Sequence, residues 1–341
     1  MTDRDAEIDR FLTHAGWQNA SVAPLAGDAS NRRYLRLSRD AGRDKAVLMD
    51  APAEKGEDVR PFIRIATWLK TSGFSAPEIF AQDEKLGFLL LEDLGDALFA
   101  RVVPDDPELE MRLYCAATDL LGALHDIQPP SQLECYSVEV MTNAAALAYD
   151  WYLDAVSGPN DEAKAHFIAQ LTDLLSTHAP ASDVLIQRDY HSENLLWLPE
   201  RSGVARVGLL DFQDAMLGHR AYDLVSLLQD ARRDVPLEIE QQMITHYAQA
   251  TGQNPAQFDA AYHVLGAQRN LRILGVFARL CVRDGKAHYV DLIPRVWEAL
   301  QRDLRHPALH SIAQTLSDDL PAPTPALLEG LKAKCATYPA L

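Results

Sequence analysis

Apolar and polar side chains alternate over residues 31–37, a pattern typical of a half-buried strand. Short apolar runs predict further strands at 46–49 and 88–91, and another strand is expected near 78–80. One stretch has a helical period instead, and we expect a helix at 59–69 that ends before Gly73. The first part of the chain therefore predicts a small sheet with one helix.

Most of the remaining chain repeats its apolar positions with the period of a helix. Helices are expected at 113–125, 141–156 and 162–175, and again from 222 onward. Between these, 184–212 contains two short apolar runs separated by a polar loop. The expected fold class is α+β, with a small sheet-containing N-lobe at 1–95 and a large, mainly helical C-lobe at 96–341.

Composition narrows the possible functions. The chain has 341 residues and a formal net charge of −17, from 32 Lys and Arg against 49 Asp and Glu. Because nucleic-acid binding needs clustered Lys and Arg, we expect no nucleic-acid partner. The apolar runs fall far short of the roughly 20 residues that span a bilayer, and the N-terminus lacks the pattern of a signal peptide. Four cysteines without C-x-x-C spacing indicate a reduced, cytoplasmic protein. Nothing in the sequence points to an obligatory protein partner.

Two motifs carry the chemistry. Asp189 stands after a short apolar run and is followed five residues later by Asn194, the spacing of the catalytic loop in phosphoryl-transfer enzymes. A carboxylate can take the proton of an acceptor hydroxyl, and an amide oxygen is a neutral ligand for Mg²⁺. A second apolar run ends at Asp211, where a further metal-binding carboxylate is expected. The ordered pair of motifs predicts phosphoryl transfer.

Asp223 stands in the first turn of an expected helix. Either the helix dipole stabilises the carboxylate there, or the carboxylate accepts hydrogen bonds from the backbone of the catalytic loop. Both interpretations make Asp223 a structural support of the site.

These segments resemble the aminoglycoside phosphotransferase and choline kinase superfamily, whose members are relatives of the protein kinases. The resemblance covers about 25–300 and rests on GDASNRRYLRL, LLLEDLG, LGALH, RDYHSENLLW, LLDFQDA and HRAYDLVSLLQDAR. Within the superfamily, GDASNRRYLRL, VLMDAP, DFQDA and QRNLRILGVFARLCVRDGK look like the bacterial kinases that phosphorylate the anomeric hydroxyl of N-acetylmuramate and N-acetylglucosamine.

The resemblance implies a bilobal, protein-kinase-like fold that uses ATP and Mg²⁺ and phosphorylates a small hydroxyl-bearing acceptor. Asp189 would be the catalytic base, and Asn194 and Asp211 would bind the metal. The backbone of Glu92 and Leu94 would contact adenine. The other implied ATP-binding positions are Gly27, Ser30, Asn31, Arg33, Val47, Leu196 and Leu210, with Leu25 beside them. The apolar ones are equally explained as core.

Two positions depart from the family's pattern. Gln187 stands where the family usually has a histidine that braces the loop, and Met49 stands where a strand usually supplies a phosphate-pairing cation. Arg33 and Arg36 on the neighbouring strand are the candidates to replace that cation, and strand alternation slightly favours Arg33. The other interpretation is that both arginines are solvated strand residues.

Four residues are candidates for the acceptor site: Asp214, Trp151, Arg269 and Arg272. Trp151 can stack on a sugar or fill a helix–helix seam. Arg269 and Arg272 can bind an acceptor carboxylate or form salt bridges within the protein. The sequence leaves both questions open.

The leading hypothesis is an ATP- and Mg²⁺-dependent kinase acting on the anomeric hydroxyl of an amino sugar in cell-wall recycling. An aminoglycoside-modifying resistance enzyme is an alternative of the same class. A nucleotide-binding pseudokinase with a regulatory role is another, suggested by Met49 and Gln187. Retention of Asp189, Asn194 and Asp211 favours an active enzyme.

Overall fold

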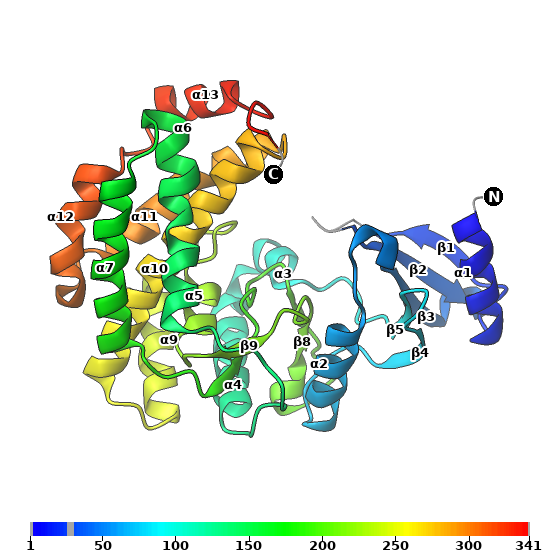
Figure 1. Ribbon diagram of the computed structural model, residues 1–341. Coiled ribbons are helices and arrows are strands. Elements are labelled where there is room, and N and C mark those ends of the chain that lie inside the picture. The colour runs from blue at the N-terminus through cyan, green and yellow to red at the C-terminus, as the bar shows by residue number, and fades with distance from the viewer. Residues whose placement is uncertain (1–2, 26–30, 340–341) are drawn as a thin grey trace. The chain divides into compact units, whose positions relative to one another are not determined.

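The computed structural model describes residues 3–25 and 31–339, and the chain divides into two compact units (Figure 1). Unit 1 comprises 1–116 and 193–215, and unit 2 comprises 117–192 and 216–341. The units are thus discontinuous along the chain, because 193–215 packs with the N-terminal residues. The division into functional lobes at Gly95 stays a prediction.

Unit 1 is built on a five-stranded antiparallel sheet with the order β1-β2-β3-β5-β4. Its strands are β1 (Ser21–Pro24), β2 (Arg33–Arg39), β3 (Asp44–Asp50), β4 (Ile79–Asp83) and β5 (Phe88–Glu92). The four strands predicted from the sequence are confirmed, whereas β1 was not predicted. A separate antiparallel pair is formed by β7 (Leu195–Trp197) and β8 (Val207–Leu209).

The helices of unit 1 are α1 (Asp3–His14), α2 (Arg60–Thr71), α3 (Phe99–Asp105) and the first half of α4 (Glu110–His125). The predicted helix at 59–69 corresponds to α2. Sequence reasoning missed α1, in which large apolar residues are few. Ile8 and Leu12 of α1 nevertheless pack with the buried Leu37, Leu48 and Leu90. This cluster forms the core on one face of the sheet.

A buried carboxylate fastens α1 to that face. Asp50 is 4% exposed, and its Oδ1 lies 2.6 Å from Nη2 of Arg4 on α1. Its Oδ2 lies 2.9 Å from Nη2 of Arg33 on β2. Two guanidinium groups thus compensate the desolvation of one carboxylate. Arg33 consequently belongs to the α1 side of the sheet.

Unit 2 is mainly helical around one long helix, α10 (Pro255–Val282). The second half of α4 lies in this unit, and the other helices are α5 (Val138–Ala145), α6 (Asp154–Ser157), α7 (Asp161–His178), α8 (Tyr222–Leu228), α9 (Leu237–Ala250), α11 (Ile293–Asp303), α12 (His310–Asp319) and α13 (Pro325–Ala333). α10 packs against α5, α7, α8, α9, α11 and α13 (Figure 1). A short antiparallel pair joins β6 (Val184–Ile186) to β9 (Met216–Gly218). Among the described helices, none is both long and apolar enough to cross a bilayer.

The helix predicted at 141–156 is helical but not continuous. It consists of α5, the π-helical segment η4 (Ala148–Leu153) and α6. η4 packs closely on α10, where a Cβ atom added to Gly275 would overlap the backbone carbonyl of Leu147. Only glycine allows the two backbones to approach this closely at that position.

Gly275→Ala is expected to destabilise the protein by about 1–3 kcal/mol, because the methyl group would push α10 away from η4. The matched control is Gly330→Ala on α13, where an added Cβ has no heavy atom within 4 Å. Thermal or denaturant unfolding of the two variants gives the comparison. Equal melting temperatures for the two variants would contradict the close-packing interpretation.

His125 at the end of α4 is 6% exposed, and its Nδ1 lies 2.6 Å from the hydroxyl of Tyr247. Burial, helped by the charges of Arg220 and His219, lowers the pKa of His125 to about 3. The unfolded ring therefore takes up a proton near pH 6.5, whereas the folded ring stays neutral until the pH approaches 3. His125 thus favours folding above pH 6.5, and this contribution is lost as the pH falls toward 3.

Replacing this ring should flatten the acid limb of the stability curve. For one buried histidine, stability falls by about 1.4 kcal/mol per pH unit below pH 6.5. His125→Asn should lower stability at pH 8 and also reduce the slope between pH 6.5 and 4. Urea unfolding at a series of pH values measures both, and an unchanged slope would refute the assignment.

Candidate active site

The catalytic-loop motif begins directly after β6, within unit 2. The backbone N–H of Gln187 donates to Oδ2 of Asp223 at 2.6 Å, and the N–H of Arg188 donates to Oδ1 at 2.9 Å. Asp223 is fully buried at the start of α8. Burial raises the pKa of Asp223 to about 7, although the two N–H donors act in the opposite direction. These contacts favour the second interpretation of Asp223, an acceptor for the loop backbone.

The turn before Asp189 is conformationally demanding. Arg188 has a φ of 73°, in the left-handed region that few residues other than glycine adopt. Ser226 donates a hydrogen bond to the carbonyl of Arg188 at 3.3 Å, and Nη2 of Arg269 donates to the Ser226 hydroxyl at 2.8 Å. Arg269 is 3% exposed. Its contacts therefore brace the loop from inside the protein, which leaves little surface for an acceptor.

Gln187 takes part in this support through its backbone, and its side chain is buried. Its backbone contact to Asp223 does not depend on the type of side chain. Gln187 can therefore replace the family's histidine without loss of that hydrogen bond.

The second half of the loop is held by Asp230, a residue that sequence reasoning missed. Its Oδ2 accepts from the N–H of Ser192 at 3.3 Å and from the Ser192 hydroxyl at 2.5 Å. Its Oδ1 accepts from the N–H of Arg232 at 2.8 Å. Nη1 of Arg232 in turn lies 3.3 Å from Nε2 of His191. Burial lowers the pKa of His191 to about 4, so this ring is neutral near pH 7.

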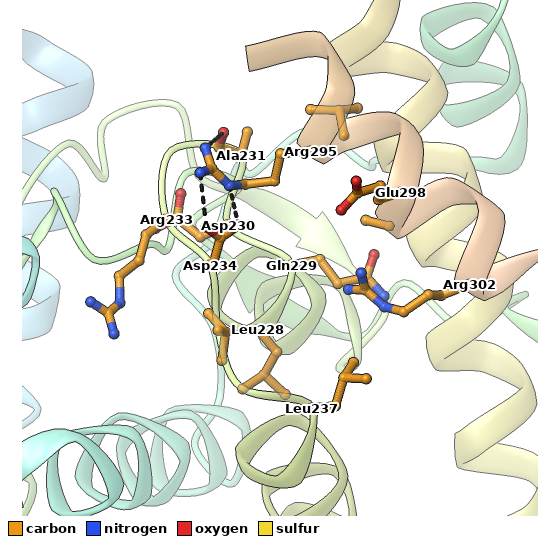
Figure 2. Close-up of a pocket in the computed structure, with 13 residues that line it drawn as sticks. Leu228, Gln229, Asp230, Ala231, Arg233, Asp234, Leu237, Arg295, Glu298 and Arg302 are labelled. Carbon is orange, nitrogen blue, oxygen red and sulfur yellow. Dashed lines mark hydrogen bonds and ion pairs between the residues drawn. The ribbon is translucent and has the colours of Figure 1, made fainter. Parts of the chain in front are cut away.

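Asp230 also lines a pocket of about 260 Å³ in unit 2 (Figure 2). One wall is a face of α11, and Figure 2 shows Arg295 of that helix bonded to Asp234. The remaining wall comes from the end of α8 and the segment that leads into α9, including Leu228 and Leu237. In the described part of the chain, none of the site residues expected from the sequence lines this pocket.

Arg272 lies in the immediate surroundings of Asp189 in unit 2. It forms a hydrogen bond with the side chain of Tyr222, and it interacts electrostatically with Tyr136 and Asp189. Burial disfavours the charged guanidinium, but these partners outweigh burial and raise the pKa of Arg272 further. The hydroxyls of Tyr136 and Tyr222 are 3.4 Å apart, and the guanidinium of Arg188 lies 5.5 Å from the centroid of the Tyr136 ring. Tyrosine hydroxyls and arginines of unit 2 thus gather near Asp189.

Trp151 and Asp214 are the two remaining acceptor candidates. The Trp151 ring lies 5.7 Å from the guanidinium of Arg283 and 6.3 Å from the ring of Tyr338. Arg283 follows Arg272 by eleven residues, roughly 16 Å along a helix. Trp151 thus packs at the far end of α10. Asp214 is exposed in unit 1, three residues beyond Asp211.

Asn194 and Asp211 are adjacent within unit 1. The carbonyl of Asn194 accepts the N–H of Leu210 at 3.0 Å, next to the β7–β8 pair. Nδ2 of Asn194 lies 3.5 Å from Oδ2 of Asp211, and Nε2 of Gln213 donates to Oδ1 of Asp211 at 2.7 Å. A half-turn of the Asn194 amide would present its oxygen next to the carboxylate. Phe212, fully buried, packs on Phe62 of α2 with ring centroids 4.9 Å apart and fixes the segment.

This donor set fits Mg²⁺. Among the described residues, no group of three or more His, Cys, Asp or Glu side chains could enclose a metal ion. Mg²⁺ typically binds one or two carboxylates and takes its other ligands from phosphates and water. One carboxylate and one amide therefore suit a metal that arrives with a nucleotide.

Unit 1 also contains the apolar positions expected around adenine. A Cβ atom at Gly208 would lie 3.1 Å from Cβ of Leu196 and 3.3 Å from Cδ1 of Leu94. Leu94 therefore packs on the β7–β8 pair beside Leu196. Val47 and Leu210 are half-buried in the same unit. Leu25 is half-buried too, whereas Gly27 and Ser30 lie outside the described residues.

The N–H of Glu92 already donates to the carbonyl of Glu78 at 2.8 Å. Its carboxylate forms an ion pair with Arg201 at 2.5 Å. A contact of the Glu92 backbone with adenine would therefore use the carbonyl and leave the N–H donor to Leu94.

The preference for Arg33 as the phosphate-pairing cation needs correction. Arg33 pairs with Asp50 on the α1 side of the sheet. Side chains alternate along β3, so Val47 and Met49 point to the opposite face. Arg36 is on the face of Val47, but its Nε lies 2.7 Å from Oδ2 of Asp93. Arg36 therefore ties β2 to the segment after β5.

Sequence reasoning missed Arg32, the residue directly before β2. Its Nε donates to Oε2 of Glu57 at 2.8 Å, and the two side chains are 12% and 11% exposed. The N–H of Asn31 donates to Oε1 of the same carboxylate at 3.0 Å. Alternation places Arg32 on the face of Tyr34, whose register partner is Met49. An arginine held by a glutamate has the chemistry of the Lys–Glu pair that serves the phosphates in protein kinases.

Known proteins resemble this chain along most of its length. The profile of the phosphotransferase enzyme family matches residues 21–262. An N-acetylmuramate/N-acetylglucosamine kinase of Caulobacter vibrioides is 36% identical over 95% of this chain and 98% of its own. A protein of the same name from Pseudomonas aeruginosa is 33% identical over 92% of this chain and 94% of its own.

Solved structures share the fold at much lower identity. A choline/ethanolamine kinase family protein from Mesorhizobium loti has a TM-score of 0.59 at 14% identity, and the match covers 96% of this chain and 97% of the other. A Plasmodium vivax ethanolamine kinase has a TM-score of 0.58 at 14% identity, with 86% and 84% covered. The α+β, protein-kinase-like fold class is thereby confirmed.

Proposed function

The chain belongs to the phosphotransferase enzyme family and is a small-molecule kinase, and on that premise we propose that it phosphorylates the anomeric hydroxyl of an amino sugar. N-acetylmuramate and N-acetylglucosamine are the proposed acceptors, and ATP is the donor. The observation that carries this proposal is the likeness to kinases of that name along almost the whole chain, at 33–36% identity. The aminoglycoside phosphotransferases among the solved structures are under 20% identical to this chain, so they support the fold and not the acceptor.

Asp189 acts in this proposal as the general base. Its carboxylate takes the proton of the attacking hydroxyl while that oxygen bonds to the γ-phosphorus and ADP departs. The hydrogen bonds from Gln187 and Arg188 to Asp223 support this role, because they hold the turn immediately before the base. Precise placement of the reacting groups supplies much of the rate in such transfers.

Asn194 and Asp211 are the proposed ligands of Mg²⁺, and Gln213 orients Asp211 through its 2.7 Å hydrogen bond. Mg²⁺, when bound, neutralises the charge that develops on the phosphates. Leu94, Leu196, Val47 and Leu210 would surround the adenine ring, and Arg32 would pair with the phosphates in place of the missing strand lysine.

A role in cell-wall recycling and a cytoplasmic location complete the proposal. The proposed acceptors are sugars of the bacterial cell wall. The cytoplasm supplies the ATP that the reaction needs. The four free cysteines are consistent with the reducing conditions there.

Incubation with ATP, Mg²⁺ and a panel of amino sugars, aminoglycosides and choline should release ADP only with the amino sugars.

Asp189→Asn should lower kcat by roughly 10²–10⁴ with ATP binding retained, because the base is lost but the nucleotide site is not. The matched control is Asp183→Asn, an exposed carboxylate just before β6 that should keep its activity. Release of ADP with aminoglycosides instead, or full activity of Asp189→Asn, would contradict the proposal.

Arg32→Gln should weaken ATP use by roughly 10- to 100-fold in kcat/KM for ATP, the size expected for a charge-assisted hydrogen bond. Arg32→Lys should restore part of it. Arg33→Gln is the matched control. The Arg33 side chain lies on the sheet face opposite to Arg32, so this variant should leave kcat and KM for ATP unchanged. Steady-state kinetics with melting temperatures separates this effect from misfolding. The reverse ranking of the two glutamine variants would restore Arg33 as the cation.

A further inference from the structure

The two arginines expected near the acceptor have different surroundings, although they are one turn apart on α10. Arg269 is 3% exposed and donates to the Ser226 hydroxyl at 2.8 Å and to the carbonyl of Gln229 at 3.4 Å. Arg272 is half-buried, and Tyr222 is its hydrogen-bond partner. Arg269 thus serves the interior of unit 2, whereas Arg272 is the one that retains exposed surface.

The position of Arg272 is fixed before any ligand binds. Tyr222 is fully buried, and its ring packs edge-on against Tyr136 with centroids 5.1 Å apart. The phenol that contacts Arg272 is therefore rigid. A guanidinium has five N–H donors in a planar fork, so one phenol can occupy only part of its capacity. The other donors suit a planar anion such as a carboxylate, which arginine binds with two parallel hydrogen bonds.

The surrounding charge favours an anion at this point. Arg188 and Arg269 belong to the same part of unit 2 as Arg272. Together the three guanidinium groups outnumber the carboxylate of Asp189, whose negative charge also reaches Arg272. The protein as a whole carries a formal charge of −17. An anionic acceptor is therefore repelled by the bulk of the protein and needs a local cation beside the base.

We propose that Arg272 binds the carboxylate of the acceptor and so determines the preference of the enzyme for N-acetylmuramate over N-acetylglucosamine. This inference rests on the proposed function. N-acetylmuramate carries a lactate ether with a carboxylate on the ring, and N-acetylglucosamine carries a hydroxyl in its place. The two sugars share the anomeric hydroxyl that Asp189 would deprotonate. A contact to Arg272 therefore distinguishes them without changing the chemical step.

The test compares Arg272→Gln with the unaltered protein on three acceptors: N-acetylmuramate, its methyl ester and N-acetylglucosamine. For N-acetylmuramate, kcat/KM should fall by roughly 10- to 100-fold, mainly through KM, as expected for a charge-assisted pair. For the ester and for N-acetylglucosamine it should stay within about twofold. The unaltered protein should itself lose a similar factor when N-acetylmuramate is replaced by its ester.

Arg283→Gln is the control, since it removes one positive charge from the C-terminal end of α10, where Arg283 pairs with Asp284. It should not change the ratio between the two sugars. Arg272→Lys should recover part of the N-acetylmuramate activity. If Arg272→Gln does not fold, the loss caused by the ester on the unaltered protein, together with Arg272→Lys, decides the question.

Equal losses on all three acceptors would overturn the inference, because Arg272 would then act on Asp189 or on the fold. An unchanged preference in Arg272→Gln would also overturn it. If the unaltered protein phosphorylates neither sugar, the proposed function itself fails and the inference fails with it. Activity of the unaltered protein on N-acetylglucosamine distinguishes these cases.

Discussion

The candidate site depends on one buried carboxylate. Asp223 accepts the backbone N–H groups of the two residues before Asp189, and no water competes for it because it is fully buried. Charge-assisted hydrogen bonds of this kind are stronger than neutral ones. They offset the left-handed backbone of Arg188, which costs of order 1 kcal/mol or more. The backbone turn before Asp189 is therefore held by α8, a helix that follows it in the sequence by more than thirty residues.

A second constraint is the supply of positive charge in an acidic protein. Met49 removes the cation that a kinase-like strand usually provides. We propose that Arg32, which pairs with Glu57 and lies on the sheet face of Met49, takes its place. In unit 2, Arg269 supports the loop, and Arg272 remains partly exposed near Asp189. Each of these arginines is fixed by a specific partner, so the net charge of −17 says little about what the site can bind.

Much of the fold follows from periodicity in the sequence. The alternation in β2, the apolar runs of β3 and β5 and the apolar stripe of α2 are strong signals because each element buries apolar side chains in a core. α1 was missed because its few apolar residues gain their stability from the sheet they cover, which is a tertiary effect. The break at η4 was missed for a similar reason, since it depends on the approach of Gly275 from a helix more than a hundred residues away.

In the candidate site, too, local features were predicted from the sequence and features set by tertiary contacts were missed. Two local features were predicted from the sequence. They are the spacing of Asp189 and Asn194 and the position of Asp211 after a strand. Arg33 was preferred over Arg36, and Arg32 was not considered, because alternation gives two faces but does not say which one carries α1. The ion pair of Arg33 with Asp50 decides that question. Asp230 was missed because its role appears only when α8 is packed against the catalytic loop.

The central proposal is that phosphate is transferred to the anomeric oxygen of an amino sugar. The most direct measurement is NMR of the product formed from ATP, Mg²⁺ and N-acetylmuramate labelled with ¹³C at the anomeric carbon. We predict that the labelled anomeric carbon shows coupling to phosphorus. A new phosphomonoester signal without coupling to the labelled carbon, or inorganic phosphate and ADP as the only new phosphorus signals, would contradict it.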